Sequence, residues 1–231
     1  MAYAQDGDEQ QTDKPQGSAV RLPTPRLQSL WQEYNRVRLA GSKKASNRLL
    51  LELIAGLRAE DEAHVEAFVH DLCSTLLASG FLANNGEEVS NAPLRLQHPL
   101  FREVVLPVLA RKCQQKDALY LRWAAQLQQF FYSDWACAET LVRAIGGAPS
   151  SYDTLHLLER SYALQASEAT LQLILEERAR RLDYFSHEYP PTLLCTVELF
   201  RQEVAAFRDL LAERADSSQW SARLKGWEGM S

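Results

Sequence analysis

The stretch from residue 24 to residue 57, TPRLQSLWQEYNRVRLAGSKKASNRLLLELIAGL, contains the signals that decide the fold. Thr24 can cap a helix that begins at Pro25, and apolar residues then recur at helical spacing. Gly41 is expected to end this helix, and Ser42 can cap a second one, whose apolar stripe follows from residue 49 to residue 57. Two helices joined by so short a turn form an antiparallel hairpin.

The same helical spacing of apolar residues continues through most of the chain. It predicts further helices over residues 61–78, 98–113, 117–145, 151–165, 168–189 and 193–211, with a kink at Pro107. No alternation of strands and helices is visible, so we expect an all-α protein of about eight or nine helices in antiparallel pairs. These pairs can form a compact bundle or a short α-solenoid, and the short turns between them favour stacking.

Breaks in the helical pattern suggest how the chain is divided. Residues 1–23 are rich in polar residues, Gly and Pro, and we expect them to form a disordered leader. Residues 24–214 should form a single helical domain, with a possible subdivision at the Gly- and Pro-containing break over residues 146–150. Residues 215–231 then remain as a C-terminal tail.

The composition excludes several classes of protein. The 231 residues include 25 Lys and Arg against 30 Asp and Glu, and this net charge of -5 opposes sequence-independent binding of nucleic acid. The longest apolar run, residues 104–110, is far shorter than a membrane span, and the acidic N-terminal segment lacks the features of a signal peptide. The cysteines lie in apolar helical patterns and are expected to be reduced and buried: Cys73, Cys113, Cys137 and Cys195. We therefore expect a cytoplasmic protein that does not enter a membrane.

Two resemblances point to helix stacking and to protein binding. Residues 157–185, LLERSYALQASEATLQLILEERARRLDYF, resemble the joint between two tetratricopeptide units. The succession WQEYNRVRLAGSKKASNRLLLELI, HPLFREVVLPVL, YLRWAAQL and LLERSYAL with LDYFSHEYP is similar to a group of uncharacterised bacterial helical proteins associated with toxin and immunity gene clusters. The second resemblance implies an immunity-type protein that binds another protein. Neither one assigns a catalytic residue.

Carboxylates near histidines are the patterns closest to a metal site. Two Asp-x-x-His pairs, Asp61 with His64 and Asp153 with His156, lie at predicted helix starts, where Asp serves as a cap. Asp183 and His187 lie four residues apart at a helix end, where a cation interacts favourably with the last carbonyl groups. We interpret all three pairs as structural, and we expect neither a metal nor another cofactor. Since no nucleophile or phosphate-loop motif is present either, we predict no catalytic residues.

A run of cations lies at the tip of the first hairpin. It has five basic residues and no acidic residue across 13 positions, with Ser42 opening a helix among them: Arg36, Arg38, Lys43, Lys44 and Arg48. Cations beside a helix N-terminus can bind an anion. The alternative is a solvated tip, which we favour on the overall acidic charge.

The end of the helix before Pro190 is the candidate protein interface. Tyr184 is offset from the apolar stripe of its helix and has polar neighbours, and the candidate surface comprises Asp183, Tyr184, His187, Glu188 and Tyr189. The alternative is that Tyr184 and His187 pack the helix end against the last long predicted helix. We expect a non-catalytic protein of immunity or adaptor type that binds another protein. The alternatives are an enzyme with an unmarked site in a helical cleft, and a binder of anions or nucleic acid that uses the cluster at residues 36–48. The sequence does not fix the partner or the oligomeric state.

Overall fold

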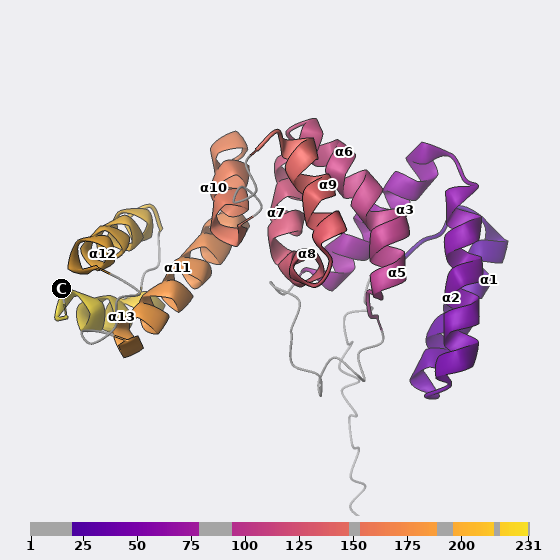
Figure 1. Cartoon of the computed structure of the whole chain (residues 1–231), viewed down its shortest axis with the longest axis horizontal. Helices are drawn as coiled ribbons and strands as arrows, with labels where there is room; N and C mark the ends of the chain where they lie inside the picture. The colour runs from indigo at the N-terminus through magenta and orange to yellow at the C-terminus, as the bar shows by residue number, and fades with distance from the viewer. Residues whose placement is uncertain (1–19, 79–93, 148–152, 189–195, 215–217, 231) are drawn as a thin grey trace, which may run out of the picture.

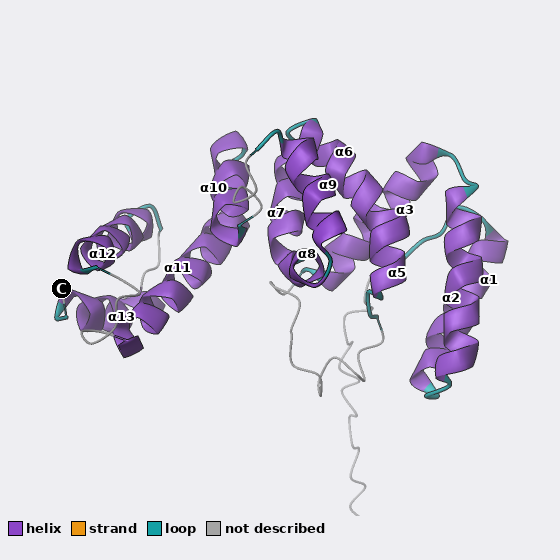
Figure 2. Cartoon of the chain, viewed as in Figure 1, coloured by secondary structure: helices purple, strands orange, loops and turns teal. Residues whose placement is uncertain are grey.

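The computed structural model describes residues 20–78, 94–147, 153–188, 196–214 and 218–230. Within these ranges the protein is helical and contains no strand, which confirms the all-α prediction (Figure 2). The helices are α1 (Pro25–Leu39), α2 (Lys43–Arg58), α3 (Glu62–Leu76), α5 (His98–Leu100), α6 (Leu106–Gln114), α7 (Ala118–Gln126), α8 (Gln128–Ser133), α9 (Trp135–Ile145), α10 (Thr154–Leu164), α11 (Glu168–Glu188), α12 (Val197–Leu211) and α13 (Ser218–Glu228), with a π-helical segment η1 (Phe101–Val105) between α5 and α6.

The α1–α2 hairpin forms as the sequence predicts. The Thr24 side chain accepts a hydrogen bond from the backbone N–H of Leu27, and Pro25 occupies the first turn. Gly41 lies in the turn between α1 and α2 and has a φ of 79°, a left-handed conformation that favours glycine. Ser42 precedes α2, but its side chain makes no capping hydrogen bond. The expectation that Ser42 caps α2 is therefore wrong.

The irregularity expected at Pro107 takes the form of a π-helical turn. A continuous helix runs from His98 to Gln114, in which the N–H of Leu106 donates to the carbonyl of Phe101, five residues earlier. Proline removes a backbone donor, and its ring crowds the preceding helical turn. The wider turn directly before Pro107 gives the ring that space.

Buried side chains form two separate apolar cores. The larger core contains residues from α1 to α10, and the smaller one lies among α11, α12 and α13. Helix α11 contributes to both, since Leu173 and Ile174 belong to the first core and Leu171, Leu175 and Leu182 to the second. The helices consequently form a row, with α1 and α2 at one end and α12 and α13 at the other (Figure 1).

Both finer predictions about the fold are wrong. The described ranges contain eleven helices rather than eight or nine, when α5, η1 and α6 are counted as one. The segment predicted as a single helix over residues 117–145 is split into three at Leu127 and Asp134, and no Gly or Pro marks these breaks. Two cores joined by α11 also differ from a bundle with one core and from a regular solenoid.

The predicted boundaries fall only partly within the described residues. Residues 1–19 of the expected leader lie outside the described residues, whereas Val20 is buried and its carbonyl accepts a hydrogen bond from Gln28. At the 146–150 break, Gly146 ends α9 with a φ of 66°, and residues 148–150 are not described. The expected tail contains α13, because Trp220 and Trp227 bury their rings against the second core.

Candidate functional site

A cavity of about 320 Å³ lies at the tip of the α1–α2 hairpin. Three segments supply its cations: Arg38 comes from the end of α1, Lys43 from the start of α2, and Arg95 from the segment that precedes α5. The other lining residues are Tyr34, Gly41, Ser46, Asn47 and Gln97, and none of the described lining residues is acidic. The cavity therefore concentrates positive charge on a protein that is acidic overall.

The hydroxyl of Tyr34 is the unusual group in this cavity. The side chain is only 1% exposed, and among the described residues its hydroxyl has no hydrogen-bond partner. Burial raises the pKa of Tyr34, while the nearby charges of Arg38 and Arg95 act in the opposite direction. Because a buried hydroxyl without a partner is costly, this one is suited to bind a group from outside the chain.

The N-terminus of α2 lies at the same cavity, which Lys43 and Ser46 line. The N–H groups of a first helical turn have no partner within their own helix, and the helix dipole makes this end positive. Ser42 does not cap them with its side chain, and the Ser46 hydroxyl is occupied in donating to the carbonyl of Lys43 at 3.1 Å. The N–H of Lys43 donates to the Gly41 carbonyl at 3.0 Å, so the cations and the positive end of the α2 dipole, and not this amide, favour an anion at the cavity.

The structure divides the five predicted anion-binding residues. Arg38 and Lys43 line the cavity, whereas Arg36 forms a two-pronged ion pair with Glu33, with N–O distances of 2.6 and 2.7 Å. Lys44 and Arg48 are exposed and do not line it.

Sequence reasoning missed two residues of this cavity, Arg95 and Tyr34. Arg95 was missed because it lies far from the hairpin along the chain and carries no local pattern. The ring of Tyr34 follows the apolar spacing of α1 and is buried, but this pattern gives no information about its hydroxyl.

The predicted protein interface lies on the last turns of α11. Asp183 forms an ion pair with Arg223 of α13, so its carboxylate serves to join two helices. Tyr184 is 54% exposed and His187 is also exposed. Glu188 ends the helix, and Tyr189 lies outside the described residues.

A second exposed aromatic residue lies at the start of α9. Trp135 is 61% exposed, whereas the other four tryptophans of the chain are at most 6% exposed. It follows Asp134, whose carboxylate lies 3.5 Å from His98. His98 and the exposed Leu51 line a groove of about 520 Å³ between α2 and the α5–η1 segment. Exposed apolar side chains are thus present at the start of α9, with Trp135, and at this groove, with Leu51.

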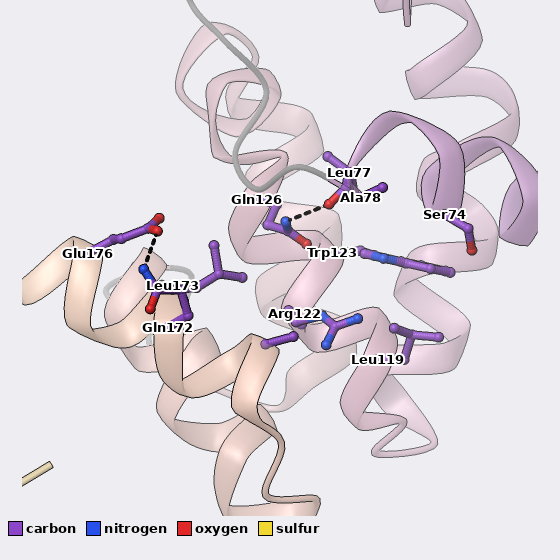
Figure 3. A pocket seen from close by; sticks show the side chains of 11 residues that line it. Ser74, Leu77, Ala78, Leu119, Arg122, Trp123, Gln126, Gln172, Leu173 and Glu176 are labelled. Atoms are coloured by element: carbon purple, nitrogen blue, oxygen red, sulfur yellow. Dashed lines mark hydrogen bonds between the residues drawn. The ribbon is translucent and has the colours of Figure 1, made fainter. Parts of the chain in front are cut away.

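A cleft of about 380 Å³ lies between α3, α7 and α11 (Figure 3). It is the candidate location for the alternative function, an enzyme site in a helical cleft. Gln126 donates to the carbonyl of Leu77 at 3.2 Å, and across the cleft Gln172 donates to Glu176 at 2.7 Å. Burial lowers the pKa of Arg122, which lies between these walls. Among the described lining residues Glu176 is the sole carboxylate, and no histidine or cysteine accompanies it. This lining lacks the paired acid and base that general acid–base catalysis uses.

The carboxylate–histidine pairs differ: Asp153 has the predicted capping role, whereas the Asp61 side chain makes no capping hydrogen bond at the start of α3. Asp153 caps α10 by accepting a hydrogen bond from the N–H of His156, and both of its oxygens also accept from Arg181 at 2.8 Å. His64 lies 3.9 Å from both Asp61 and Glu60 on the exposed start of α3.

The described cysteines are buried free thiols, as predicted. Burial raises the pKa of Cys73 and of Cys113 to about 12. Cys137 is also free and buried, and Cys195 lies outside the described residues.

Comparison with known proteins gives no relative for this chain: no family model, no curated protein and no solved structure matches it. In the described part of the chain, every helix is too short or too polar to cross a bilayer.

Proposed function

We propose that this protein binds a phosphate-bearing anion in the cavity at the tip of the α1–α2 hairpin. The main support is the buried Tyr34 hydroxyl, which has no hydrogen-bond partner in the described structure. The charges of Arg38 and Arg95 interact electrostatically with this hydroxyl. A phosphate oxygen accepts from a hydroxyl, from guanidinium groups and from helix amides at once. Tyr34, Arg38 and Arg95 line the cavity and offer the first two kinds of donor.

The size of the cavity favours a small ligand. A volume of about 320 Å³ is at the lower end of the range for small-molecule sites, and it accommodates a phosphate group with part of the molecule that bears it. A nucleic acid would instead contact a wide basic surface, and the net charge of -5 opposes such binding. The ligand class is therefore a small phosphate compound, bound without catalysis.

The test is calorimetric titration with pyrophosphate. Arg38→Gln and Arg95→Gln should each weaken binding at least tenfold, because each removes a charged donor from the cavity. Arg36→Gln is the matched control, since this nearby arginine is paired with Glu33 and should leave the affinity within a factor of two. Equal weakening by all three variants would indicate only a general attraction to positive charge, and it would reject the site.

A second candidate function is the binding of another protein, as for an immunity-type or adaptor protein. The support for this function is Trp135, which is exposed, whereas the other tryptophans are buried. Tryptophan is enriched among the residues that contribute most to binding at protein interfaces. The exposed Leu51 lines a groove that also contains His98, which lies 3.5 Å from Asp134, the residue before Trp135. In this proposal the protein acts in the cytoplasm, where buried free thiols such as Cys73 and Cys113 stay reduced.

The test of the second candidate compares two surfaces. Trp135→Ala and Tyr184→Ala each remove one exposed ring and should leave the melting temperature nearly unchanged. If Trp135 anchors the interface, partner capture from the native host fails for Trp135→Ala and persists for Tyr184→Ala. The reverse pattern would place the interface at the end of α11, and equal capture by both variants would reject both surfaces.

A further inference from the structure

Three side chains with metal-binding atoms meet where α5 approaches the start of α9. They are His98, Asp134 and Cys137, and their ligand atoms all lie within 4.8 Å of one another. The imidazole Nε2 of His98 is 3.5 Å from Oδ2 of Asp134. None of the three lines the cavity at the hairpin tip. The group is therefore independent of the proposed anion site.

Local structure holds each of these groups in place. Asp134 caps α9 through Oδ1, which accepts from the N–H of Ala136 at 3.0 Å, so that Oδ2 remains directed at His98. Cys137 lies one helical turn after Asp134, and its N–H donates to the Asp134 carbonyl at 3.0 Å. The ring of His98 lies beside that of Phe130, with 6.2 Å between the centroids. The three ligand groups are thus positioned without a metal.

We propose that His98, Asp134 and Cys137 bind a divalent transition metal of the zinc type. Zinc accepts imidazole nitrogen, carboxylate oxygen and thiolate sulfur at about 2.0–2.3 Å. Tetrahedral geometry with these bonds places neighbouring ligand atoms roughly 3.3–3.8 Å apart. The 3.5 Å between His98 and Asp134 fits this range, and the sulfur lies within 4.8 Å of both other ligand atoms. A mixed set with one sulfur favours zinc over magnesium or calcium.

The site has three protein ligands and leaves a fourth position open. Cys137 is buried, whereas His98 and Asp134 are partly exposed, so the open position lies on the solvent side and is available to water. Binding replaces the proton of the Cys137 thiol with the metal and releases that proton to solvent. The nearby Arg102 guanidinium lies 3.1 Å from Glu103, a carboxylate that it shares with Arg58.

The test is titration of the full chain with Co²⁺, followed by absorption spectroscopy. A tetrahedral site with a thiolate ligand gives an intense sulfur-to-cobalt charge-transfer band and strong visible bands. We expect these at one equivalent of Co²⁺, with loss of the visible bands when Zn²⁺ displaces it. Cys137→Ser should abolish the charge-transfer band, and His98→Gln should weaken Co²⁺ binding at least tenfold.

The matched control is His64→Ala, which removes an exposed histidine that also lies near two carboxylates. It should leave the titration unchanged. If Cys137→Ser does not fold, His98→Gln decides the result, because His98 is partly exposed and its replacement should be tolerated. Absence of the charge-transfer band in the wild type, or its persistence in Cys137→Ser or at full strength in His98→Gln, would overturn the proposal. Neither outcome bears on pyrophosphate binding.

Discussion

Arg95 and Tyr34 are distant in the sequence but line the same cavity, together with Arg38. The positive charges of Arg95 and Arg38 oppose the rise in the pKa of Tyr34 that burial causes. The hydroxyl is buried, and no described group accepts or donates a hydrogen bond to it. Two cations around a hydroxyl without a partner create a place for an acceptor that the described chain does not supply. A phosphate oxygen meets that need.

Tyr34→Phe should separate ligand binding from stability. Without a ligand the change removes a buried hydroxyl that has no described partner, so we expect stability to stay constant or to rise by up to about 1 kcal/mol. Binding of pyrophosphate should weaken, because one donor is lost. Urea denaturation with and without pyrophosphate measures both effects. A free protein destabilised by about 2 kcal/mol or more would mean that the hydroxyl has a structural partner.

Gly56→Ala should destabilise the α1–α2 hairpin, although alanine favours helices. A Cβ at residue 56 would lie 2.5 Å from Cδ2 of Leu27, which is buried and cannot move freely. We expect a loss of roughly 1–3 kcal/mol from this overpacking. Gly226→Ala is the control, since its added Cβ meets nothing within 4 Å and should stabilise α13 by about 0.5–1 kcal/mol. Equal effects in thermal denaturation would contradict the close packing of α1 on α2.

Ser161→Ala should weaken the contact between α10 and α7. The buried Ser161 hydroxyl donates to the carbonyl of Ala118 at 2.7 Å and joins two helices that are distant in the sequence. Its loss leaves that carbonyl without this donor, and we expect a cost of about 1–2 kcal/mol by urea denaturation. Ser29→Ala provides the comparison, because the Ser29 hydroxyl bonds only within its own helix and is exposed. A change below about 0.5 kcal/mol at residue 161 would show that the bond is dispensable.

Glu66→Gln should make the protein less stable at neutral pH but not in acid. Hydrogen bonds from Lys112 and Arg111 hold the pKa of Glu66 below its usual value. A carboxylate with a lowered pKa stabilises the folded state above its unfolded-state pKa, and this contribution is lost as the pH falls through the folded-state pKa. The difference in unfolding free energy between wild type and variant should therefore shrink between pH 7 and pH 3. A difference independent of pH would show that the charge of Glu66 is not involved.

The fold was predictable wherever local signals coincide. Thr24, Pro25 and Gly41 mark the ends of the first hairpin, and the apolar stripe of each helix indicates the face that it buries. The break at Asp134 had a local signal that was missed, because Asp134 caps α9, whereas the break at Leu127 has no capping side chain, glycine or proline. Tertiary packing determines such ends, and the sequence alone does not report it.

The candidate site could be predicted only in part, for a related reason. Arg38 and Lys43 were found because they belong to one local cluster of cations. Arg95 reaches the cavity only because the segment before α5 packs on the hairpin. The lack of a described hydrogen-bond partner for the Tyr34 hydroxyl is a property of the folded chain. His98 likewise meets Asp134 and Cys137 only when α5 packs beside α9.

A crystal structure of the protein grown with pyrophosphate tests the anion site most directly. We expect phosphate density in the hairpin cavity, with an oxygen at hydrogen-bonding distance, about 2.6–3.0 Å, from the Tyr34 hydroxyl and with Arg38 and Arg95 as further donors. Phosphate bound instead at the exposed Lys44 and Arg48, with the cavity filled by water or by other parts of the chain, would contradict this expectation.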